Sequence, residues 1–258
     1  MTTCQQKLTE SIEERLDELV PNKIDNPLFA AARYSLFAPS KRLRPLFVLR
    51  IAECYSIDIE LALNPACALE IVHTYSLIHD DLPCMDNDDE RRGKPSLHKA
   101  YPEGHAMLTG DFLLTYAFEI LASSPNLTAE QRIALIQSLS RYSGEEGMAG
   151  GQASDLEWQR SGYQPDWQEF AIMLSKKTAA LFACAFEMGG IIANASNEDI
   201  LLLRDAGLAY GLAFQIQDDI ADGDGCLPLL GHETASALAI QLLSSAKKSL
   251  PHNCHSLF

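Results

Sequence analysis

The sequence predicts an all-α fold, a single-domain helical bundle. Apolar residues recur at helical spacing along most of the 258-residue chain, and no stretch alternates as a half-buried strand does. Turn-forming stretches such as Pro21-Asn22, Ser124-Pro125-Asn126 and Gly223-Asp224-Gly225 separate the helical ones. Hydrophobic residues make up 47% of the chain, which is enough for a sizeable core.

The periodic stretches predict helices at 5–20, 26–37, 41–55, 58–82, 104–123, 128–147, 165–192, 197–222 and 232–249. Thr128 followed by Gln131 matches a capping box and marks one helix start. The first predicted helix is amphipathic and has no apolar core of the kind that signal peptides carry. No run of about 18 apolar residues occurs, so we expect no transmembrane segment.

The charge and cysteine content restrict partners and compartment. The chain has 20 basic and 35 acidic residues, a net charge of −15, which argues against binding nucleic acid or an anionic membrane. A small anionic substrate is still possible if positive charge is local or carried by metal ions. The seven cysteines are scattered without a C-x-x-C pair, which favours a reducing compartment, the cytosol or an organelle stroma; we expect a cytoplasmic protein.

The densest charge follows the predicted helix 58–82. Pro83 cannot continue that helix, so Asp80 and Asp81 are expected at its C-terminal end, where the helix dipole is negative and disfavours carboxylates. Asp86 follows closely in the chain. Several oxygens gathered at such a point suit Mg²⁺, which binds carboxylates together with phosphate oxygens of a substrate. Seen alone, the acidic run could equally be a solvated surface.

A second acidic cluster lies on the predicted helix 197–222. Gln215, Asp218, Asp219 and Asp222 share one stripe of that helix, at spacings that normally carry apolar core residues. Buried carboxylates need metal ions, cationic partners or water. Two such clusters, each at the end of a long apolar helix, together indicate a metal site.

Basic residues stand out in so acidic a chain. Two of them open the predicted helix 41–55, close to the positive helix N-terminus, and others follow the first acidic cluster or interrupt an apolar helix. Singly, each could be an exposed surface residue. Together with the aspartates they favour recognition of two diphosphate groups. These residues are Lys41, Arg44, His73, Arg91, Arg92 and Lys177.

The ordered motifs resemble those of the trans-isoprenyl diphosphate synthases, specifically the bacterial farnesyl and plant-type geranylgeranyl diphosphate synthases. The resemblance covers about residues 27 to 250. It rests on Lys41-Arg42-Leu43-Arg44-Pro45, the run from His73 to Asp86, Arg91-Arg92-Gly93-Lys94-Pro95, Gly110-Asp111, Gly150-Gly151-Gln152 with Asp155-Leu156, Lys177-Thr178, and Phe214-Gln215 with Gln217-Asp218-Asp219 and Asp222.

The resemblance implies an isoprenoid-synthase bundle with a central cavity, and a magnesium-dependent prenyltransferase. Two or three Mg²⁺ ions would be held by Asp80, Asp81, Asp86 and, on a facing helix, Asp218, with support from Asp219 and Asp222. The allylic diphosphate would be contacted by Arg91, Lys177 and Gln215. The diphosphate of isopentenyl diphosphate would be held by Lys41, Arg44, His73 and Arg92. Thr178 and Gln215 would stabilise the allylic cation with their oxygen dipoles.

Product length is predicted from the same helix. Ser76 and Tyr75 precede Asp80 by four and five residues, about 6 to 8 Å along the axis. In the family that this chain resembles, an aromatic residue at this place stops chain growth. We therefore expect the C15 product, farnesyl diphosphate, with the C20 product as the alternative; Tyr75 could also be an ordinary packing residue. The family also implies a homodimer.

The sequence departs from the family pattern in three places. A basic loop with two lysines is missing after Gly225, about one C-terminal helix is missing, and Ser40 replaces a usual glycine. We expect one polyprenyl synthase domain over 1–258 that lacks these parts, which leaves a weakly active or regulatory subunit of a heteromeric synthase as an alternative. Two further alternatives fit the sequence less well. A class I terpene cyclase lacks the second diphosphate site that the basic residues indicate here. A di-iron bundle needs Glu-x-x-His pairs on two of its helices.

Overall fold

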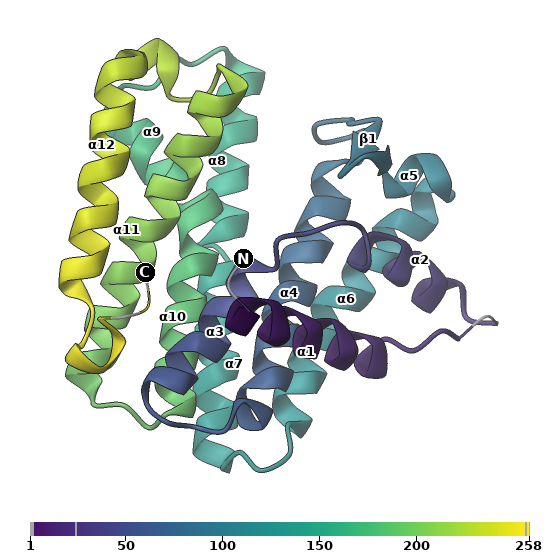
Figure 1. The fold of residues 1–258 in the computed structure, drawn as a ribbon. Coiled ribbons are helices and arrows are strands. Elements are labelled where there is room, and N and C mark those ends of the chain that lie inside the picture. The colour runs from purple at the N-terminus through teal and green to yellow at the C-terminus, as the bar shows by residue number, and fades with distance from the viewer. Residues whose placement is uncertain (1–2, 24, 256, 258) are drawn as a thin grey trace. The chain divides into compact units, whose positions relative to one another are not determined.

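The computed structural model describes residues 3–23, 25–255 and 257, and the predicted all-α class is confirmed (Figure 1). The described residues pack into two compact units. Unit 1 consists of Met1–Leu49 and Ile59–Arg132, and unit 2 of Arg50–Asp58 and Ile133–Phe258. The single domain over 1–258 with its central cavity stays a prediction.

Unit 1 is built around helix α4 (Ile59–Asp80). Every residue from Ala62 to Val72 is buried, as expected for a helix that is apolar on all sides. Three helices pack on it: α1 (Thr3–Leu19), α2 (Pro27–Leu36) and α6 (Glu103–Ser123). The rest of the unit comprises the start of α3 (Leu43–Cys54), strands β1 (Glu90–Arg91) and β2 (Lys94–Pro95), α5 (Leu97–Ala100) and the start of α7 (Ala129–Ser143).

The two strands form a short hairpin that the sequence did not predict. Glu90 pairs with Pro95 and Arg91 with Lys94 in antiparallel register. The two-residue loop between the strands has positive φ at both positions, 55° and 75°, as a type I′ turn requires. Because the first of these residues is Arg92 rather than asparagine or glycine, the usual sequence signal of the turn is weak.

Unit 2 is a layer of long helices centred on α11 (Asn197–Asp222), which packs against α10 (Ala180–Ile192) and α12 (Leu227–Ser249). Helix α11 comes close to the chain just before α10 because Gly211 has no side chain. A Cβ at Gly211 would lie 2.6 Å from the Cα of Ala179. The other elements are α8 (Met148–Ser161), α9 (Trp167–Leu174), the π-helical turn η1 (Ser175–Ala179) and the 3₁₀ turn η2 (His252–Cys254).

Most predicted helices are present, but α5 and α8 were not predicted, and the predicted helix 165–192 consists of α9, η1 and α10. Helix α7 ends at Ser143 instead of 147, and α8 follows where no helix was predicted. Glycine lowers helix propensity, and Gly150-Gly151 obscured that helix. Helix α12 begins at Leu227 instead of 232 and is kinked at Gly231, whose φ is 71°.

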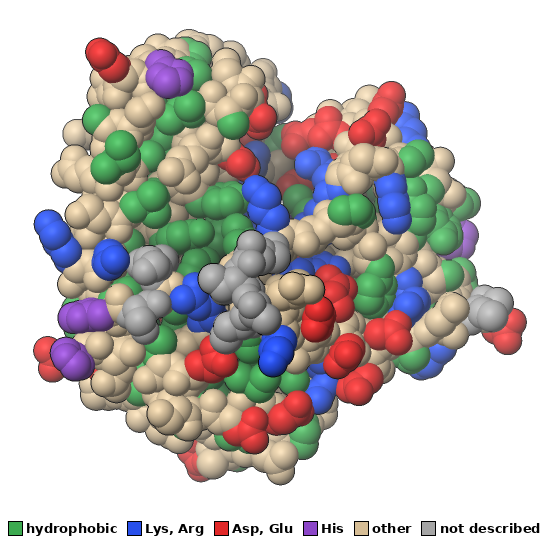
Figure 2. Space-filling model, viewed as in Figure 1, with side chains coloured by type: hydrophobic (Ala, Val, Ile, Leu, Met, Phe, Trp, Pro, Cys, Tyr) green, Lys and Arg blue, Asp and Glu red, His purple; other side chains and the backbone are tan. Residues whose placement is uncertain are grey.

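Two of the described helices, α4 and α6, are long and apolar enough to cross a bilayer by length and composition alone. In the apolar 18-residue stretch of α4, 78% is buried inside the protein, which identifies α4 as a core helix. In α6 only 39% is buried. The acidity of the surface is visible over α1, where Glu and Asp side chains gather (Figure 2).

Candidate functional site

The first acidic cluster lies where α4 ends. The helix ends at Asp80, three residues before Pro83, which cannot continue it. The chain then turns back, so that the backbone N–H of Asp86 donates to the carbonyl of Asp80 at 2.9 Å. This return brings the backbones of the first and third aspartates of the motif together within unit 1, with Asp81 between them in sequence.

Asp81 is almost completely buried and is paired with a cation. Its side chain is 3% exposed, and its Oδ1 accepts a hydrogen bond from Arg91 Nε at 2.8 Å. Arg91 also donates to Asp88 Oδ2 at 2.8 Å. Burial raises the pKa of Asp81, and the hydrogen bond from Arg91 opposes that rise. The hairpin therefore places one positive charge beside the aspartate cluster.

A pocket of about 360 Å³, partly open to solvent, adjoins this ion pair. Charged groups of both signs line it, and apolar side chains from α2, α4 and α5 complete the wall. The lining includes Thr74, Asp81, Arg91 and Arg92. A pocket with clustered cations and a carboxylate suits an anionic ligand that is bound together with a metal ion.

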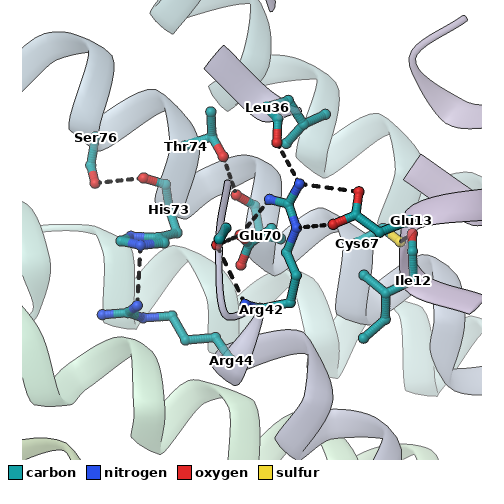
Figure 3. A network of polar contacts seen from close by, with 11 residues as sticks. Ile12, Glu13, Leu36, Arg42, Arg44, Cys67, Glu70, His73, Thr74 and Ser76 are labelled. Carbon is teal, nitrogen blue, oxygen red and sulfur yellow. Dashed lines mark hydrogen bonds and ion pairs between the residues drawn. The ribbon is translucent and has the colours of Figure 1, made fainter. Parts of the chain in front are cut away.

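The predicted second diphosphate site is partly assembled. Arg44, at the start of α3, lies with Nη1 3.1 Å from Nε2 of His73 on α4 (Figure 3). A guanidinium can only donate, so this imidazole nitrogen accepts. Burial and the nearby arginines, Arg44 first and then Arg92, lower the pKa of His73 well below its usual value, so the ring is neutral. Lys41, three residues before Arg44, is exposed.

Arg42, in the same basic run, has a different role that sequence reasoning missed. It is 1% exposed, and Nη1 donates to Glu70 Oε1 at 2.8 Å while Nε donates to Glu13 Oε1 at 2.7 Å (Figure 3). These contacts join α1 and α4 through the loop before α3. Only Arg44 and Lys41 of the run are therefore available to a ligand.

In unit 2, Lys177 and Thr178 lie on the π-helical turn η1. Such turns often occur at functional sites. Lys177 Nζ donates to Asp155 Oδ2 at 2.5 Å, a partner to which the sequence analysis gave no role. The backbone of α8 lies very close to η1 at this point, because a Cβ at Gly151 would lie 2.3 Å from the backbone nitrogen of Lys177. Helix α8 thus packs against η1 and holds the side chain of Lys177.

The second acidic stripe is divided between buried and exposed carboxylates. Asp219 is 5% exposed; its Oδ1 accepts from Gln215 Nε2 at 2.8 Å and its Oδ2 from the Cys226 backbone N–H at 2.9 Å. Asp218 and Asp222 are exposed. Both oxygens of Asp219 are thus engaged: Oδ1 within α11 and Oδ2 with the connection to α12. The role of Asp219 as a metal ligand stays a prediction.

Gln215 is held at both ends of its amide. Its Oε1 accepts a hydrogen bond from the Thr178 hydroxyl at 2.8 Å, while its nitrogen donates to Asp219 as described above. The three side chains form a chain of hydrogen bonds from η1 to the end of α11. The two residues predicted to stabilise an allylic cation are therefore brought together.

The donor atoms fit Mg²⁺ in kind. The aspartates of both clusters offer only oxygens, which hard divalent ions prefer. Among the described residues, no three His, Cys, Asp or Glu side chains are already grouped closely enough to hold a metal.

The predicted chain-length residues lie on α4 one turn before the aspartates. Tyr75 is 9% exposed, and its ring meets His79 edge-on at a centroid distance of 5.7 Å. Burial, with a smaller effect of Asp80, raises the pKa of Tyr75 to about 12, so the phenol is neutral. The Ser76 hydroxyl donates to the His73 carbonyl at 2.9 Å. The role of Tyr75 and Ser76 in product length stays a prediction.

Comparison with known proteins identifies related sequences and folds. A family model described as polyprenyl synthetase matches residues 25–236. The farnesyl diphosphate synthase of Bacillus subtilis is 42% identical over 230 residues, which cover 88% of this chain and 77% of that enzyme. The chloroplastic geranylgeranyl pyrophosphate synthase of Capsicum annuum is 40% identical over 82% of this chain and 58% of its own length. The crystal structure of an FPP/GFPP synthase from Zymomonas mobilis superposes with a TM-score of 0.91 at 39% identity, covering 96% of this chain and 91% of that one.

Proposed function

Because the chain belongs to the polyprenyl synthetase family, we propose that it condenses isopentenyl diphosphate with an allylic diphosphate, dimethylallyl or geranyl diphosphate, to give farnesyl diphosphate. The observation that carries this proposal is the pocket in unit 1 where the buried Asp81 meets Arg91 and Arg92. Geranylgeranyl diphosphate is the alternative product, favoured by the similarity to the plant enzyme.

The metal ligands that we propose are Asp80, Asp81 and Asp86 in unit 1 and, in unit 2, Asp218 with Asp219 and Asp222 in support. When bound there, Mg²⁺ would neutralise the charge that develops on the leaving diphosphate. Arg91 and Lys177 add fixed positive charge for the same group. Both cations already have carboxylate partners, Asp81 and Asp155, which hold their side chains in place before substrate binds.

The remaining residues orient the second substrate and the cation. Arg44 and the neutral His73 would hold the diphosphate of isopentenyl diphosphate together with Lys41 and Arg92. The Thr178 hydroxyl donates its proton to Gln215, so its oxygen lone pairs can face a positive carbon. Positioning of this kind supplies much of the rate of a two-substrate reaction.

The direct test is incubation of the purified chain with isopentenyl diphosphate, Mg²⁺ and each allylic donor in turn, with products identified by mass. We expect C15 product from both the C5 and the C10 donor, and none after chelation of the metal. A folded protein that elongates no donor would reject the proposal. Activity that appears only on adding a catalytically competent synthase would instead support a regulatory subunit.

Tyr75→Ala should lengthen the product. Removal of a buried ring opens space for further isoprene units beyond the aspartates, so we expect C20 and longer chains in place of C15. Tyr75→Phe keeps the ring and should keep the C15 product, because only the hydroxyl is lost. Product length is read by mass after extraction, and an unchanged C15 product from the alanine variant would reject the role of Tyr75 as a floor.

We further propose a homodimer that buries the apolar face of α6. Met107 and Leu108 are 47% and 56% exposed, on a helix of which only 39% of the apolar window is buried in one chain. Leu108→Lys should shift the protein from dimer to monomer in analytical ultracentrifugation. Ile240→Lys on α12, at an even more exposed apolar residue (68%), is the matched control and should leave the dimer intact. A Leu108→Lys protein that stays dimeric excludes this face.

We place the protein in the cytoplasm. The structure keeps Cys54, Cys67, Cys84, Cys184, Cys226 and Cys254 as free thiols, consistent with a reducing compartment.

A further inference from the structure

The pocket of unit 1 is also lined by Lys94, in addition to Arg91 and Arg92. Lys94 is the first residue of strand β2, and its side chain is exposed. The substrate contacts proposed above involve the two arginines and not this lysine. Because Lys94 is exposed, its charge stays hydrated until a ligand binds, so its presence in the pocket carries no cost of burial.

The register of the hairpin places Lys94 on the same face as Arg91. The two residues lie directly opposite each other in the antiparallel pair. Side chains of opposite residues point to the same face of a two-stranded sheet. On that face Arg91 reaches Asp81, with Nε 2.8 Å from Oδ1. The Lys94 side chain therefore leaves the hairpin on the side of the first aspartate cluster.

Tyr34 on α2 determines where the Lys94 side chain lies. The Tyr34 hydroxyl donates to the Pro95 carbonyl at 2.8 Å, and the Lys94 ammonium lies 5.7 Å from the centroid of the Tyr34 ring. Tyr101 meets the same ring edge-on at a centroid distance of 5.7 Å. A cation within about 6 Å of an aromatic face is attracted by the ring. Two consecutive residues of β2 are thus held by one tyrosine, which itself lines the pocket.

The charges around the hairpin favour an anion between Arg91 and Lys94. Asp88 pairs with Arg91 at 2.8 Å, and Asp89 pairs with Lys99 at 2.8 Å, so these nearby carboxylates already have cationic partners. Like charges that lie directly opposite each other in a strand pair repel. An anion that contacts both Arg91 and Lys94 would relieve that repulsion.

We propose that Lys94 is a further substrate-binding residue, which contacts the diphosphate of the allylic substrate beside Arg91, and that Tyr34 is its positioning residue. The identity of this diphosphate rests on the proposed function. A lysine loses rotamer freedom when it binds a ligand, and contact with the Tyr34 ring restricts the side chain beforehand. The planar fork of Arg91 and the point charge of Lys94 then bind different oxygens of one diphosphate.

Binding of inorganic pyrophosphate with Mg²⁺, measured by isothermal titration calorimetry, tests the site without turnover. Lys94→Met should weaken binding by about tenfold, because a hydrogen bond between charged groups is lost. Lys99→Met is the matched control: it removes an exposed lysine that pairs with Asp89, and it should bind pyrophosphate as the wild type does. Equal affinities of the two variants overturn the proposal.

A double-mutant cycle tests the positioning role of Tyr34. Tyr34→Leu should weaken pyrophosphate binding by about threefold, the usual effect of losing a solvent-exposed contact between a cation and an aromatic ring. In the Lys94→Met background the same change should have no further effect, because the ring then has no ammonium to hold. A loss of equal size in both backgrounds would show that Tyr34 does not act through Lys94.

Steady-state kinetics assign the site to one substrate. Lys94→Met should raise the KM for the allylic donor by about tenfold and leave the KM for isopentenyl diphosphate nearly unchanged. An equal or larger rise in the KM for isopentenyl diphosphate contradicts the assignment to the allylic diphosphate. Since pyrophosphate binding needs no turnover, a wild-type protein that binds pyrophosphate through Lys94 but elongates no donor rejects the proposed function and keeps the binding site.

Discussion

Asp81→Ala should lower turnover by about 10³-fold or more, because it removes a buried carboxylate from the proposed metal site and a partner from Arg91. Stability should change much less, by about 1 kcal/mol, because Arg91 is 35% exposed and keeps its contact with Asp88. The measurement is the initial rate of elongation at saturating Mg²⁺, with the melting temperature as a check of folding.

A matched control separates the metal role from the ion pair. Asp88→Ala removes the other, half-exposed carboxylate that Arg91 contacts, and it should retain most of the activity. Asp81→Asn keeps the shape and one oxygen but loses the charge, so its rate should be close to that of the alanine variant. If Asp81→Ala and Asp88→Ala show similar rates, Asp81 does not have the role proposed for it.

Glu70→Ala should destabilise the protein by about 3–5 kcal/mol, because it leaves the Arg42 guanidinium buried without its main partner. Arg42 is 1% exposed and Glu70 2%, so solvent cannot replace the lost carboxylate. The free energy of unfolding from urea titration measures the effect. The remaining pair with Glu13, itself 39% exposed, favours the lower end of the range.

Two further variants sharpen this prediction. Glu13→Ala removes the half-exposed partner and should cost about 1 kcal/mol, since water can reach that side of the guanidinium. The double variant Arg42→Met with Glu70→Leu removes both charges, and apolar packing should recover much of the loss. A loss for Glu70→Ala no larger than that for Glu13→Ala would show that the buried Arg42–Glu70 pair contributes no more than the half-exposed Arg42–Glu13 pair.

The predictable part of the fold is the part set by local chemistry. Apolar spacing located the long helices, and Pro83 located the end of α4. Helix α8 was missed because its glycines lower helix propensity, and at least Gly151 serves a contact with η1 that only tertiary structure reveals. The hairpin was missed because Arg92 adopts a left-handed conformation with no glycine at that position.

The candidate site shows the same division. Residue type and order predict the aspartates and the cations around them, and in the structure Arg91 contacts Asp81. Sequence could not separate Arg42 from Arg44, because the difference lies in burial against Glu13 and Glu70 from distant segments. It also could not show that Asp219 accepts from the Cys226 N–H, which depends on how the chain turns after α11.

The π-helical turn η1 has a consequence for how this part of the chain can change. An α-helix advances by about 100° per residue, so the extra residue of a wider turn rotates α9 by roughly that angle relative to α10, compared with an uninterrupted helix. Deleting one residue between Ser175 and Ala179 would restore regular winding. The deletion would also rotate α9 or α10 away from the helices against which it packs. Lys177 could then not contact Asp155 while Thr178 kept its hydrogen bond to Gln215. The length of this segment is therefore constrained as strictly as its composition.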